Sequence, residues 1–299
     1  MTINCCSNGT EHEMTNLVYA LIYGSVVAVG LPLNAISLWI LLRHHGSKSP
    51  SAVFMINLVI SDLLLIASLI MRVHYYSLGT WQFGWLACIC FTMLFRNNIR
   101  TSSIFITFIS VDRLLAVVYP LRSRNLRTTS KAVRGAVFVW LMIIGVNVPE
   151  SVGFSRDLDN CTCFEFNNSA TNRTEQSSEE FAVGCFQLVL LFTLLVVNIV
   201  STAMVSWTLH RNLNESAKVK NKLNVNLIFA MNLMMFTVFF LPVSLVVFFV
   251  DLRSVLSCLA STNCCLDPLL YYFSFDGFWK KKEDVETSLA RGKSLNVNR

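Results

Sequence analysis

Seven ionisable side chains interrupt stretches of the sequence that are otherwise almost wholly apolar. They are Asp62, Arg72, Arg96, Arg100, Asp112, Arg113 and Asp267. An ionised group at the centre of a membrane helix costs roughly 2.5–3.5 kcal/mol on insertion scales, so each of these residues needs an opposite charge, water or a ligand. They are therefore the first candidates for a functional site.

Two of the acids, Asp62 in NLVISDLLL and Asp267 in NCCLDPLLYY, lie among other polar side chains. Asn263 precedes Asp267 by one helical turn, and Asn34 and Ser102 fall at similar depths in their own segments. Two nearby carboxylates repel each other, and one tends to hold a proton. We expect these groups to enclose one hydrated cation. The alternative is that Asp62 is a buried acid bonded to its neighbours.

A second group of residues has the chemistry of an anion site. Arg96 and Arg100 are four residues apart, so they share one helix face, and Arg100 lies about 20 Å from Arg113 at a rise of 1.5 Å per residue. Only Glu150, just past Pro149, offers them an acid. The candidate contacts to a carboxylate or phosphate are Arg72, His74, Tyr75, Arg96 and Arg100. The alternative is that Arg72 and Arg96 snorkel to the outer membrane interface.

The elements that must position these residues are predicted to be membrane-spanning helices. Of the 299 residues, 54% are hydrophobic and only 14% are charged, whereas about 25% are charged in soluble chains. Mean hydropathy is +0.55. Each helical span needs roughly 20 apolar residues. We expect spans near 17–42, 53–77, 85–118, 132–149, 181–210, 223–250 and 255–275. The predicted fold is all-α, a seven-transmembrane helix bundle (17–275) between an N-terminal segment (1–16) and a C-terminal segment (276–299).

Basic residues and glycosylation sequons assign the two sides of the membrane. The segments after spans one, three, five and seven, with the first turns of span four, hold 17 of the 24 Lys and Arg residues. By the positive-inside rule this side is cytoplasmic. Sequons then fall outside at Asn8, Asn160, Asn167 and Asn172, beside cysteines that indicate an oxidising exterior. We expect a multi-pass plasma-membrane protein with an extracellular N-terminus and an uncleaved signal anchor.

Taken in order, the motifs resemble those of the rhodopsin-like (class A) G-protein-coupled receptors over about 17–282. The matching pieces are GLPLN, NLVISD, WQFG, Cys88, VDRLLAVVYPL, Trp140, FFLP and NCCLDPLLYYF. The DP–Y variant and Phe240 in place of the usual Trp resemble the branch of purinergic-nucleotide, hydroxycarboxylic-acid, oxoeicosanoid, succinate and lysophospholipid receptors. The resemblance implies a receptor, not an enzyme. Its ligand would be an extracellular anionic small molecule (carboxylate, phosphate or lipid acid), and its intracellular partner a heterotrimeric G protein; no nucleic acid is expected.

The resemblance also implies roles for individual residues. The residues of a sodium site, sodium being the one bound cofactor expected, would be Asp62, Ser102, Asn263 and Asp267. The residues of G-protein coupling and activation would be Asp112, Arg113, Phe236, Phe240, Pro242, Pro268 and Tyr271. Among these, Arg113 would hold Asp112 at rest and meet the G protein in the active state, and the two prolines would kink their helices.

The remaining implications concern the two ends of the bundle. On the outer side, Cys88 would pair with Cys161 or Cys163, and Cys5 or Cys6 would pair with the other loop cysteine. On the inner side, FSFDGFWKKK would form a short amphipathic eighth helix, whose lysines suit anionic membrane lipid.

Two departures from the family pattern keep other functions open. Leu114 occupies the third position of the DRY-type motif, and Pro268 follows Pro242 by only 26 positions, which predicts a tight link at 251–254. The first alternative is a non-signalling receptor-like or decoy protein. A transporter is less favoured, because no inverted repeat accompanies the intramembrane charges. No nucleophile–base pair or metal-ligand cluster in the sequence indicates an enzyme.

Overall fold

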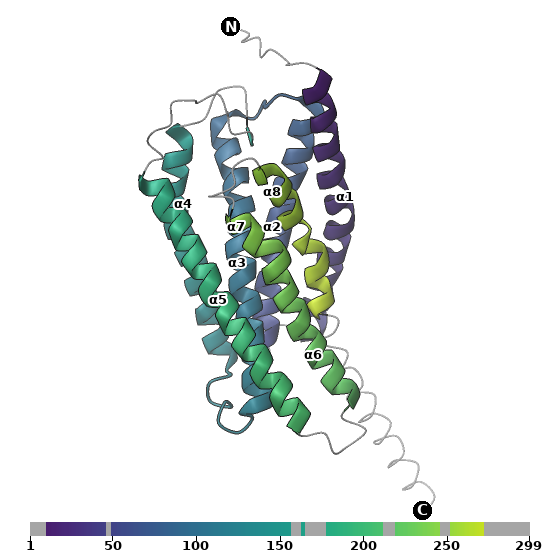
Figure 1. Cartoon of the computed structure of the whole chain (residues 1–299), viewed down its shortest axis with the longest axis vertical. Coiled ribbons are helices and arrows are strands. Elements are labelled where there is room, and N and C mark those ends of the chain that lie inside the picture. The colour runs from purple at the N-terminus through teal and green to yellow at the C-terminus, as the bar shows by residue number, and fades with distance from the viewer. Residues whose placement is uncertain are drawn as a thin grey trace, which may run out of the picture.

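The computed structural model describes residues 10–45, 49–156, 163–164, 178–211, 219–245 and 252–271. Within these ranges every regular element is a helix, and the long helices run side by side along one axis (Figure 1). Six of them are long and apolar enough to cross a membrane. The all-α prediction is therefore confirmed, and the seventh span needs a separate description.

The first five helices follow the predicted spans closely. They are α1 (Thr10–Ile40, continued by the π-turn η1, Leu41–His45), α2 (Pro50–Leu78), α3 (Gly84–Val118), α4 (Thr129–Arg156) and α5 (Ser178–Arg211). Local sequence explains the ends of α2. Ser49 caps its first turn by accepting a hydrogen bond from the Ala52 N–H, Pro50 fits the first helical position, and Gly79 ends it in the left-handed conformation with φ of 69°.

The last two spans are less regular. α6 (Val219–Met234) passes into a π-helical segment, η4 (Met235–Phe240), and then into α7 (Leu241–Ser244). Pro242 has no N–H to donate, and the widened turn before it is one way in which a helix accommodates a proline. The seventh span comprises α8 (Arg253–Ser261), a turn at Thr262 and a second helical stretch, 263–271. Residues 246–250 of the predicted sixth span and 272–275 of the seventh lie outside the described residues.

The predicted fourth span was too short. It was expected to end at Pro149, but α4 continues through this proline to Arg156. A proline costs a helix one backbone hydrogen bond, and neighbouring helices in a membrane bundle can supply compensating contacts. The correction matters for the function, because it places Glu150 within a helix of the bundle instead of in a loop.

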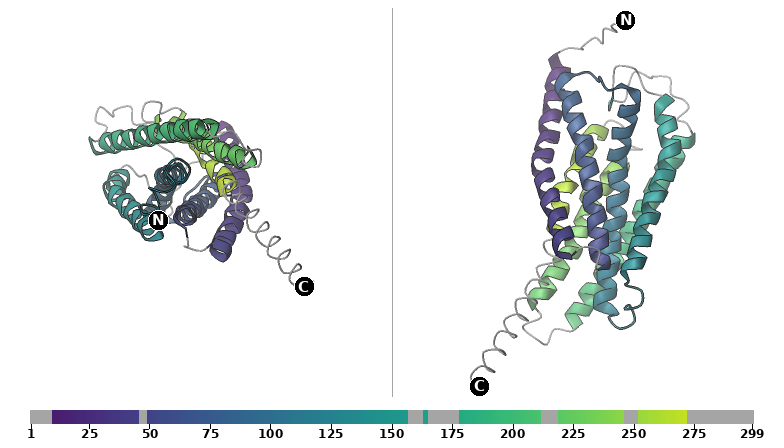
Figure 2. Two further views of the ribbon diagram at one scale, coloured as in Figure 1. Left: turned by 90° about the horizontal axis from the view of Figure 1, so that it is seen from below. Right: turned by 180° about the vertical axis from the view of Figure 1, so that it is seen from behind.

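α3 is the central element of the bundle. It packs against α2, α4, α5 and α6, and the end-on view shows it enclosed by the other helices (Figure 2). Because it has neighbours on several sides, its polar residues are buried. Those with the lowest exposure are Arg100, Thr101, Ser102, Ser103 and Ser110. A polar group in this position must find a partner on another helix or on its own backbone, which ties α3 to its neighbours.

A hydrogen bond joins the seventh span to α1. Its acceptor is a backbone carbonyl that Pro268 leaves without the usual helical donor. A proline cannot donate to the carbonyl four residues before it, which here belongs to Cys264. The Asn34 amide donates to that carbonyl at 2.7 Å, and also to the Gly30 carbonyl of its own helix at 3.0 Å. A Cβ on Gly30 would lie 3.1 Å from the Cys264 Sγ, so the two helices approach closely there. The two spans are thus held together by the Asn34 bond, by the contact of the Cys265 thiol with the Val26 carbonyl at 3.6 Å, and by small side chains.

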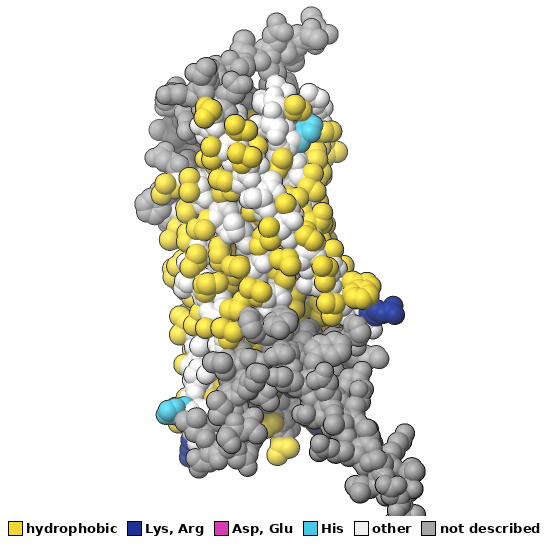
Figure 3. All heavy atoms as spheres, turned by 90° about the vertical axis from the view of Figure 1, so that its right-hand side faces the viewer, with side chains coloured by type: hydrophobic (Ala, Val, Ile, Leu, Met, Phe, Trp, Pro, Cys, Tyr) yellow, Lys and Arg dark blue, Asp and Glu magenta, His cyan; other side chains and the backbone are white. Residues whose placement is uncertain are grey.

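The outer surface of the bundle is apolar over most of its length. Apolar side chains cover the face drawn in Figure 3, and the basic side chains visible there lie near its lower end. Exposed residues of this kind include Leu21, Phe138, Leu141, Val189 and Trp207. Exposure of such a surface to water is unfavourable, whereas the hydrocarbon core of a bilayer matches it.

Candidate functional site

The outer end of the bundle is organised by a disulfide. Cys88, in the first turns of α3, is bonded to Cys163 with a Cα–Cα distance of 5.8 Å. Of the two pairings expected for Cys88, the one with Cys163 is therefore confirmed. Cys5, Cys6 and Cys161 lie outside the described residues, as do the four sequons.

The disulfide fixes the position of the next residue, Phe164. Its φ of 68° is unusual for a residue with a side chain. Its ring packs edge-on against Tyr75 and Trp81, with centroid distances of 5.7 and 5.4 Å. The Phe164 ring also contacts a cation, because the Arg72 guanidinium carbon lies 4.4 Å from its centroid. The covalent bond therefore holds an aromatic cover over one of the predicted anion contacts.

Arg72 is enclosed by aromatic rings instead of by acids. Its guanidinium also lies 4.4 Å from the Phe95 centroid on α3 and 5.8 Å from the Tyr23 centroid on α1. The residue is only 7% exposed, and its Nε has no hydrogen-bond partner. Among the residues whose side chains the structure describes, no carboxylate forms an ion pair with it. A buried guanidinium that keeps a free N–H is suited to bind an anion.

Arg96 and Arg100 have a different environment, because both contact Glu150. The Arg96 Nη1 donates to one carboxylate oxygen at 2.6 Å, and the Arg100 Nη1 lies 2.8 Å from the other. Arg100 also donates to the Gln187 Oε1 on α5 at 3.3 Å. The sequence had indicated Glu150 as the acid available to these arginines, but it placed the residue just beyond the end of the fourth span. The extension of α4 past Pro149 puts Glu150 within the helix instead.

The other two predicted contacts, His74 and Tyr75, follow Arg72 on the last turns of α2. Tyr75 is 2% exposed and belongs to the aromatic cluster below Phe164. The His74 ring packs against Phe83 at 5.1 Å, and its Nδ1 is buried without a hydrogen-bond partner. The structure therefore brings Tyr75 next to Arg72, and it gives no direct contact between His74 and the arginines.

A second polar cluster lies deeper in the bundle, around Asp62 and Asp267. The two carboxylates are close enough to interact electrostatically, and both are fully buried. Asn98, on α3, donates from its amide to the Asp62 Oδ1 at 3.0 Å and to the Ser102 Oγ at 3.1 Å. Asn263 donates to the Asn98 Oδ1 at 3.3 Å. The four predicted residues thus share one cluster, in which Asn98 bonds to Asp62, Ser102 and Asn263.

Several oxygens of this cluster lack partners. They are Asn34 Oδ1, Asp62 Oδ2, Asn263 Oδ1, both Asp267 carboxylate oxygens and the Tyr271 hydroxyl. A set of buried oxygens that includes two carboxylates fits a hard monovalent or divalent cation, which binds oxygen ligands. Asn98 was missed because an amide has no charge to mark it, although its spacing of four residues from Ser102 places both on one helix face.

The cytoplasmic end of α3 differs from the expectation for Arg113. Asp112 accepts hydrogen bonds from Ser51 and, through both oxygens, from Arg127 at 2.8 and 3.0 Å. These bonds raise the pKa of the Arg127 guanidinium above its ordinary value. Asp112 is therefore held by α2 and by the segment before α4, not by Arg113, whose Nε has no hydrogen-bond partner. The spacing of charges along the chain does not reveal a partner 15 residues away.

The predicted activation residues of the sixth and seventh spans lie in the buried interior. Phe236 and Phe240 pack edge to face at 5.5 Å, within the π-helical segment before Pro242. Tyr271 is 4% exposed, and its hydroxyl belongs to the oxygens without partners. Two interhelical bonds that were not predicted lie nearby. Asn232 donates to Ser110 at 2.6 Å, and Asn198 donates to Thr107 at 2.8 Å.

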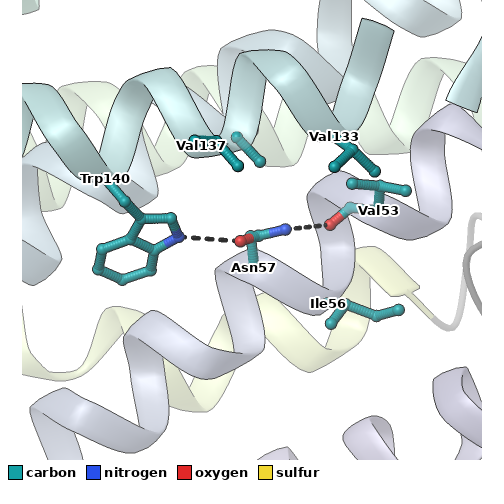
Figure 4. Close-up of a pocket in the computed structure, with 7 residues that line it drawn as sticks. Val53, Ile56, Asn57, Val133, Val137 and Trp140 are labelled. Atoms are coloured by element: carbon teal, nitrogen blue, oxygen red, sulfur yellow. Dashed lines mark hydrogen bonds between the residues drawn. The ribbon is translucent and has the colours of Figure 1, made fainter. Parts of the chain in front are cut away.

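A pocket of about 190 Å³ lies between α2 and α4. Figure 4 shows its lining, which is apolar apart from Asn57 and Trp140. The Trp140 N–H donates to the Asn57 Oδ1 at 2.9 Å, and the Asn57 amide donates to the Val53 carbonyl at 2.8 Å. Since these polar groups satisfy each other, the pocket offers no charged contact to an anion.

The fold and these clusters define a membrane receptor of the rhodopsin type, and comparison with known proteins agrees. The family model described as 7 transmembrane receptor (rhodopsin family) matches residues 33–271. The chain therefore belongs to this family, is a receptor and not an enzyme, and crosses the membrane several times.

Its similarities within the family lie on the side of lipid receptors. It is 30% identical to lysophosphatidic acid receptor 6 of Gallus gallus over 92% of this chain and 95% of the relative. It is 34% identical to lysophosphatidic acid receptor 5 of Mus musculus, over 90% of this chain and 77% of the relative. It is 30% identical to cysteinyl leukotriene receptor 1 of Sus scrofa, over 93% and 88% respectively. The resemblance to the nucleotide and lysophospholipid branch is confirmed.

Proposed function

We propose that this chain is a plasma-membrane receptor that binds an anionic lipid through its outer half and activates a heterotrimeric G protein at its cytoplasmic end. Its N-terminus lies outside the cell. The basic inner loops and the outer position of the sequons support this orientation. The names of the three relatives all refer to acidic lipids, which supports a lipid with a phosphate or carboxylate head group. Ligand binding acts by favouring one packing of the bundle over another.

The observation that carries the proposal is the environment of Arg72. This buried guanidinium lies between two aromatic rings at 4.4 Å and has no carboxylate partner among the described side chains. A charge left unpaired in a buried place is costly, which favours the binding of a partner with the opposite charge. An acidic head group would supply it, while the surrounding rings favour the apolar part of the same molecule.

The test replaces Arg72 by Met, which keeps an unbranched stem against the aromatic rings but removes the charge. With 1-oleoyl lysophosphatidic acid as the probe, we expect a loss of affinity of about ten- to a hundredfold, because a hydrogen bond to a charged group contributes about 1.5–3 kcal/mol. Binding to receptor in lipid nanodiscs measures it. Arg134→Gln, which removes an exposed charge from the inner part of α4, is the control and should bind like the wild type. Equal affinity of all three proteins would remove Arg72 from the site.

The deeper cluster supports a bound sodium ion. Asp62 and Asp267 would provide the charge, and Ser102 and Asn263 would complete the set of oxygen donors predicted from the sequence. The buried oxygens without partners are the observation that favours a cation there. A cation that fits only this arrangement of helices would stabilise the resting packing of the bundle.

A non-signalling receptor is the second candidate, and one observation favours it. Asp112 is engaged by Arg127 and Ser51, and Leu114 stands where the family motif has its third polar position. Such a protein would bind the lipid without passing a signal. Nucleotide exchange on a purified G protein distinguishes the two candidates, because a signalling receptor accelerates it with 1-oleoyl lysophosphatidic acid, whereas a decoy binds the same probe and leaves the exchange rate unchanged.

A further inference from the structure

The contact between Glu150 and two arginines leaves an excess of positive charge. Glu150 is the one acid among the described side chains that pairs with an arginine of the outer half, and it serves both Arg96 and Arg100. Arg72 pairs with no acid among the side chains that the structure describes. Counted over these residues, three arginine charges against one carboxylate leave a net charge of +2.

The pairing is incomplete in its hydrogen bonds as well. The Arg100 side chain is 1% exposed and that of Glu150 is 7% exposed, so neither can rely on bulk water. The Arg100 Nη1 pairs with the Glu150 Oε2 at 2.8 Å, but the Arg100 Nε has no hydrogen-bond partner. Buried N–H groups are nearly always satisfied. Arg100 therefore retains an N–H donor for a further acceptor. Glu150 neutralises its charge without satisfying all of its N–H groups.

The two parts of the charged region adjoin the same turn of α3. The Arg72 guanidinium lies on the ring of Phe95, and Arg96 follows Phe95 directly in the chain. Arg96 reaches Glu150 from that turn, and Arg100 does so from the next. One head group near this turn would experience the charges of all three arginines and of Glu150.

We propose that Glu150 is a built-in counterion that determines which acidic head group the receptor prefers. It reduces the charge that the three arginines provide from +3 to +2, which weakens the binding of a phosphate monoester more than that of a carboxylate and so limits the preference for phosphate. A phosphate monoester carries about −1.5 to −2 at neutral pH, and an ionised carboxylate carries −1. This inference rests on the proposed function, because it concerns the same lipid site.

The counterion has a consequence that a purely structural residue would not have. Coulomb energy is proportional to the product of the charges. Removing the negative charge of Glu150 therefore strengthens the binding of every anion, and it does so about twice as much, on a logarithmic scale, for a dianion as for a monoanion. If Glu150 only held α4 against α3, its loss would weaken the binding of both lipids or change both affinities by the same factor.

The experiment measures the affinities of two probes that share one acyl chain, 1-oleoyl lysophosphatidic acid and oleic acid, for the full-length receptor in nanodiscs. Glu150→Gln keeps the size of the side chain and removes the charge. We expect about threefold tighter binding of the carboxylate and about tenfold tighter binding of the phosphate, in keeping with the twofold logarithmic ratio. The preference for phosphate should fall in Arg96→Gln and return towards the wild-type value in the double variant Arg96→Gln/Glu150→Gln, which again carries +2.

Controls separate the failure of this inference from that of the proposed function. Arg134→Gln, at the inner end of α4, changes the total charge without touching the site and should keep the wild-type preference. If Glu150→Gln does not reach the membrane, the comparison of Arg96→Gln with the double variant decides, since adding Glu150→Gln must raise the phosphate affinity. Unchanged or equally changed affinities overturn the counterion role while leaving the receptor function intact. Failure of the wild type to bind either lipid overturns both.

Discussion

Several charged residues in this protein form ion pairs with partners that are distant in the sequence. Asp112 adjoins Arg113 in the chain but bonds to Arg127, and Arg96 and Arg100 share Glu150 from another helix. In each case the burial of the group makes an unsatisfied charge expensive, so the nearest opposite charge in space prevails over the nearest in sequence. Arg72 is the exception, and for that reason it is the strongest candidate for a ligand contact.

The need of a buried charge for a partner also applies to Asp267, and it leads to a prediction about the binding of sodium. We expect sodium chloride to raise the melting temperature of the purified wild-type receptor by a few degrees relative to choline chloride at equal ionic strength. Binding to the folded state alone adds about 1.4 kcal/mol when the ion exceeds its dissociation constant tenfold. Asp267→Asn should abolish the difference between the two salts. A sodium effect that persists in this variant would contradict the site.

At the scale of the elements, polar side-chain bonds join α3 to α5 and to α6. Asn198 connects it with α5, and Asn232 connects it with α6 just before the π-helical segment. Such interhelical bonds contribute on average about 0.6 kcal/mol in membrane proteins, and at most about 1.7 kcal/mol. The helices are thus held by bonds weak enough to be exchanged during a change of packing. α6, with its widened turn and Pro242, is the element best placed to move.

We therefore expect Asn232→Leu to raise the basal rate of nucleotide exchange on the G protein, in the absence of any lipid, by about threefold, which corresponds to 0.6 kcal/mol. The leucine removes the bond to Ser110 and keeps an apolar side chain of similar volume. Asn198→Leu, which removes the similar bond to α5, is the matched control and should have a smaller effect. Equal rates in Asn232→Leu and the wild type would show that this bond does not restrain α6.

For the molecule as a whole, the distribution of side chains determines how it lies in the membrane. Apolar residues cover the length of the helices (Figure 3), while 17 of the 24 basic residues belong to the predicted inner segments. Translocating those charges across the bilayer is unfavourable, which supports the proposal that the basic end lies in the cytoplasm. The anion site and the Asp112 cluster consequently lie at opposite ends of one bundle.

This orientation predicts the accessibility of the two termini. An epitope tag placed before Met1 should bind antibody on intact cells, whereas a tag placed after Arg299 should bind only after permeabilisation. Treatment with an N-glycosidase should also lower the apparent mass of the protein, since the sequons at Asn8 and Asn160 would be glycosylated. Detection of the first tag only after permeabilisation would reverse the proposed topology and exclude an extracellular lipid site at this end.

The class of fold and the family followed from patterns that need no three-dimensional information. Long apolar runs predict helices because lipid cannot satisfy a free backbone group, and ordered motifs such as NLVISD and NCCLDPLLYYF identify the receptor type. The gathering of Asp62, Ser102, Asn263 and Asp267 was also predictable, because equal depth in a bundle brings polar residues together. Asn98, Gln187 and Arg127 were not found in this way, since each acts through a residue on a different helix or loop, and Glu150 was indicated as an available acid but not placed within a helix.

Sequence thus determined the number of spans, the basic side of the bundle and the residue types available for an anion and a cation. Side-chain pairing depended on the folded chain, in which α4 runs past Pro149 to deliver Glu150 and a disulfide sets Phe164 over Arg72. The physical reason is the difference in range of the forces. Hydrophobic transfer and backbone satisfaction act along each segment, whereas the partner of a buried charge is selected by contacts of about 3 Å between segments.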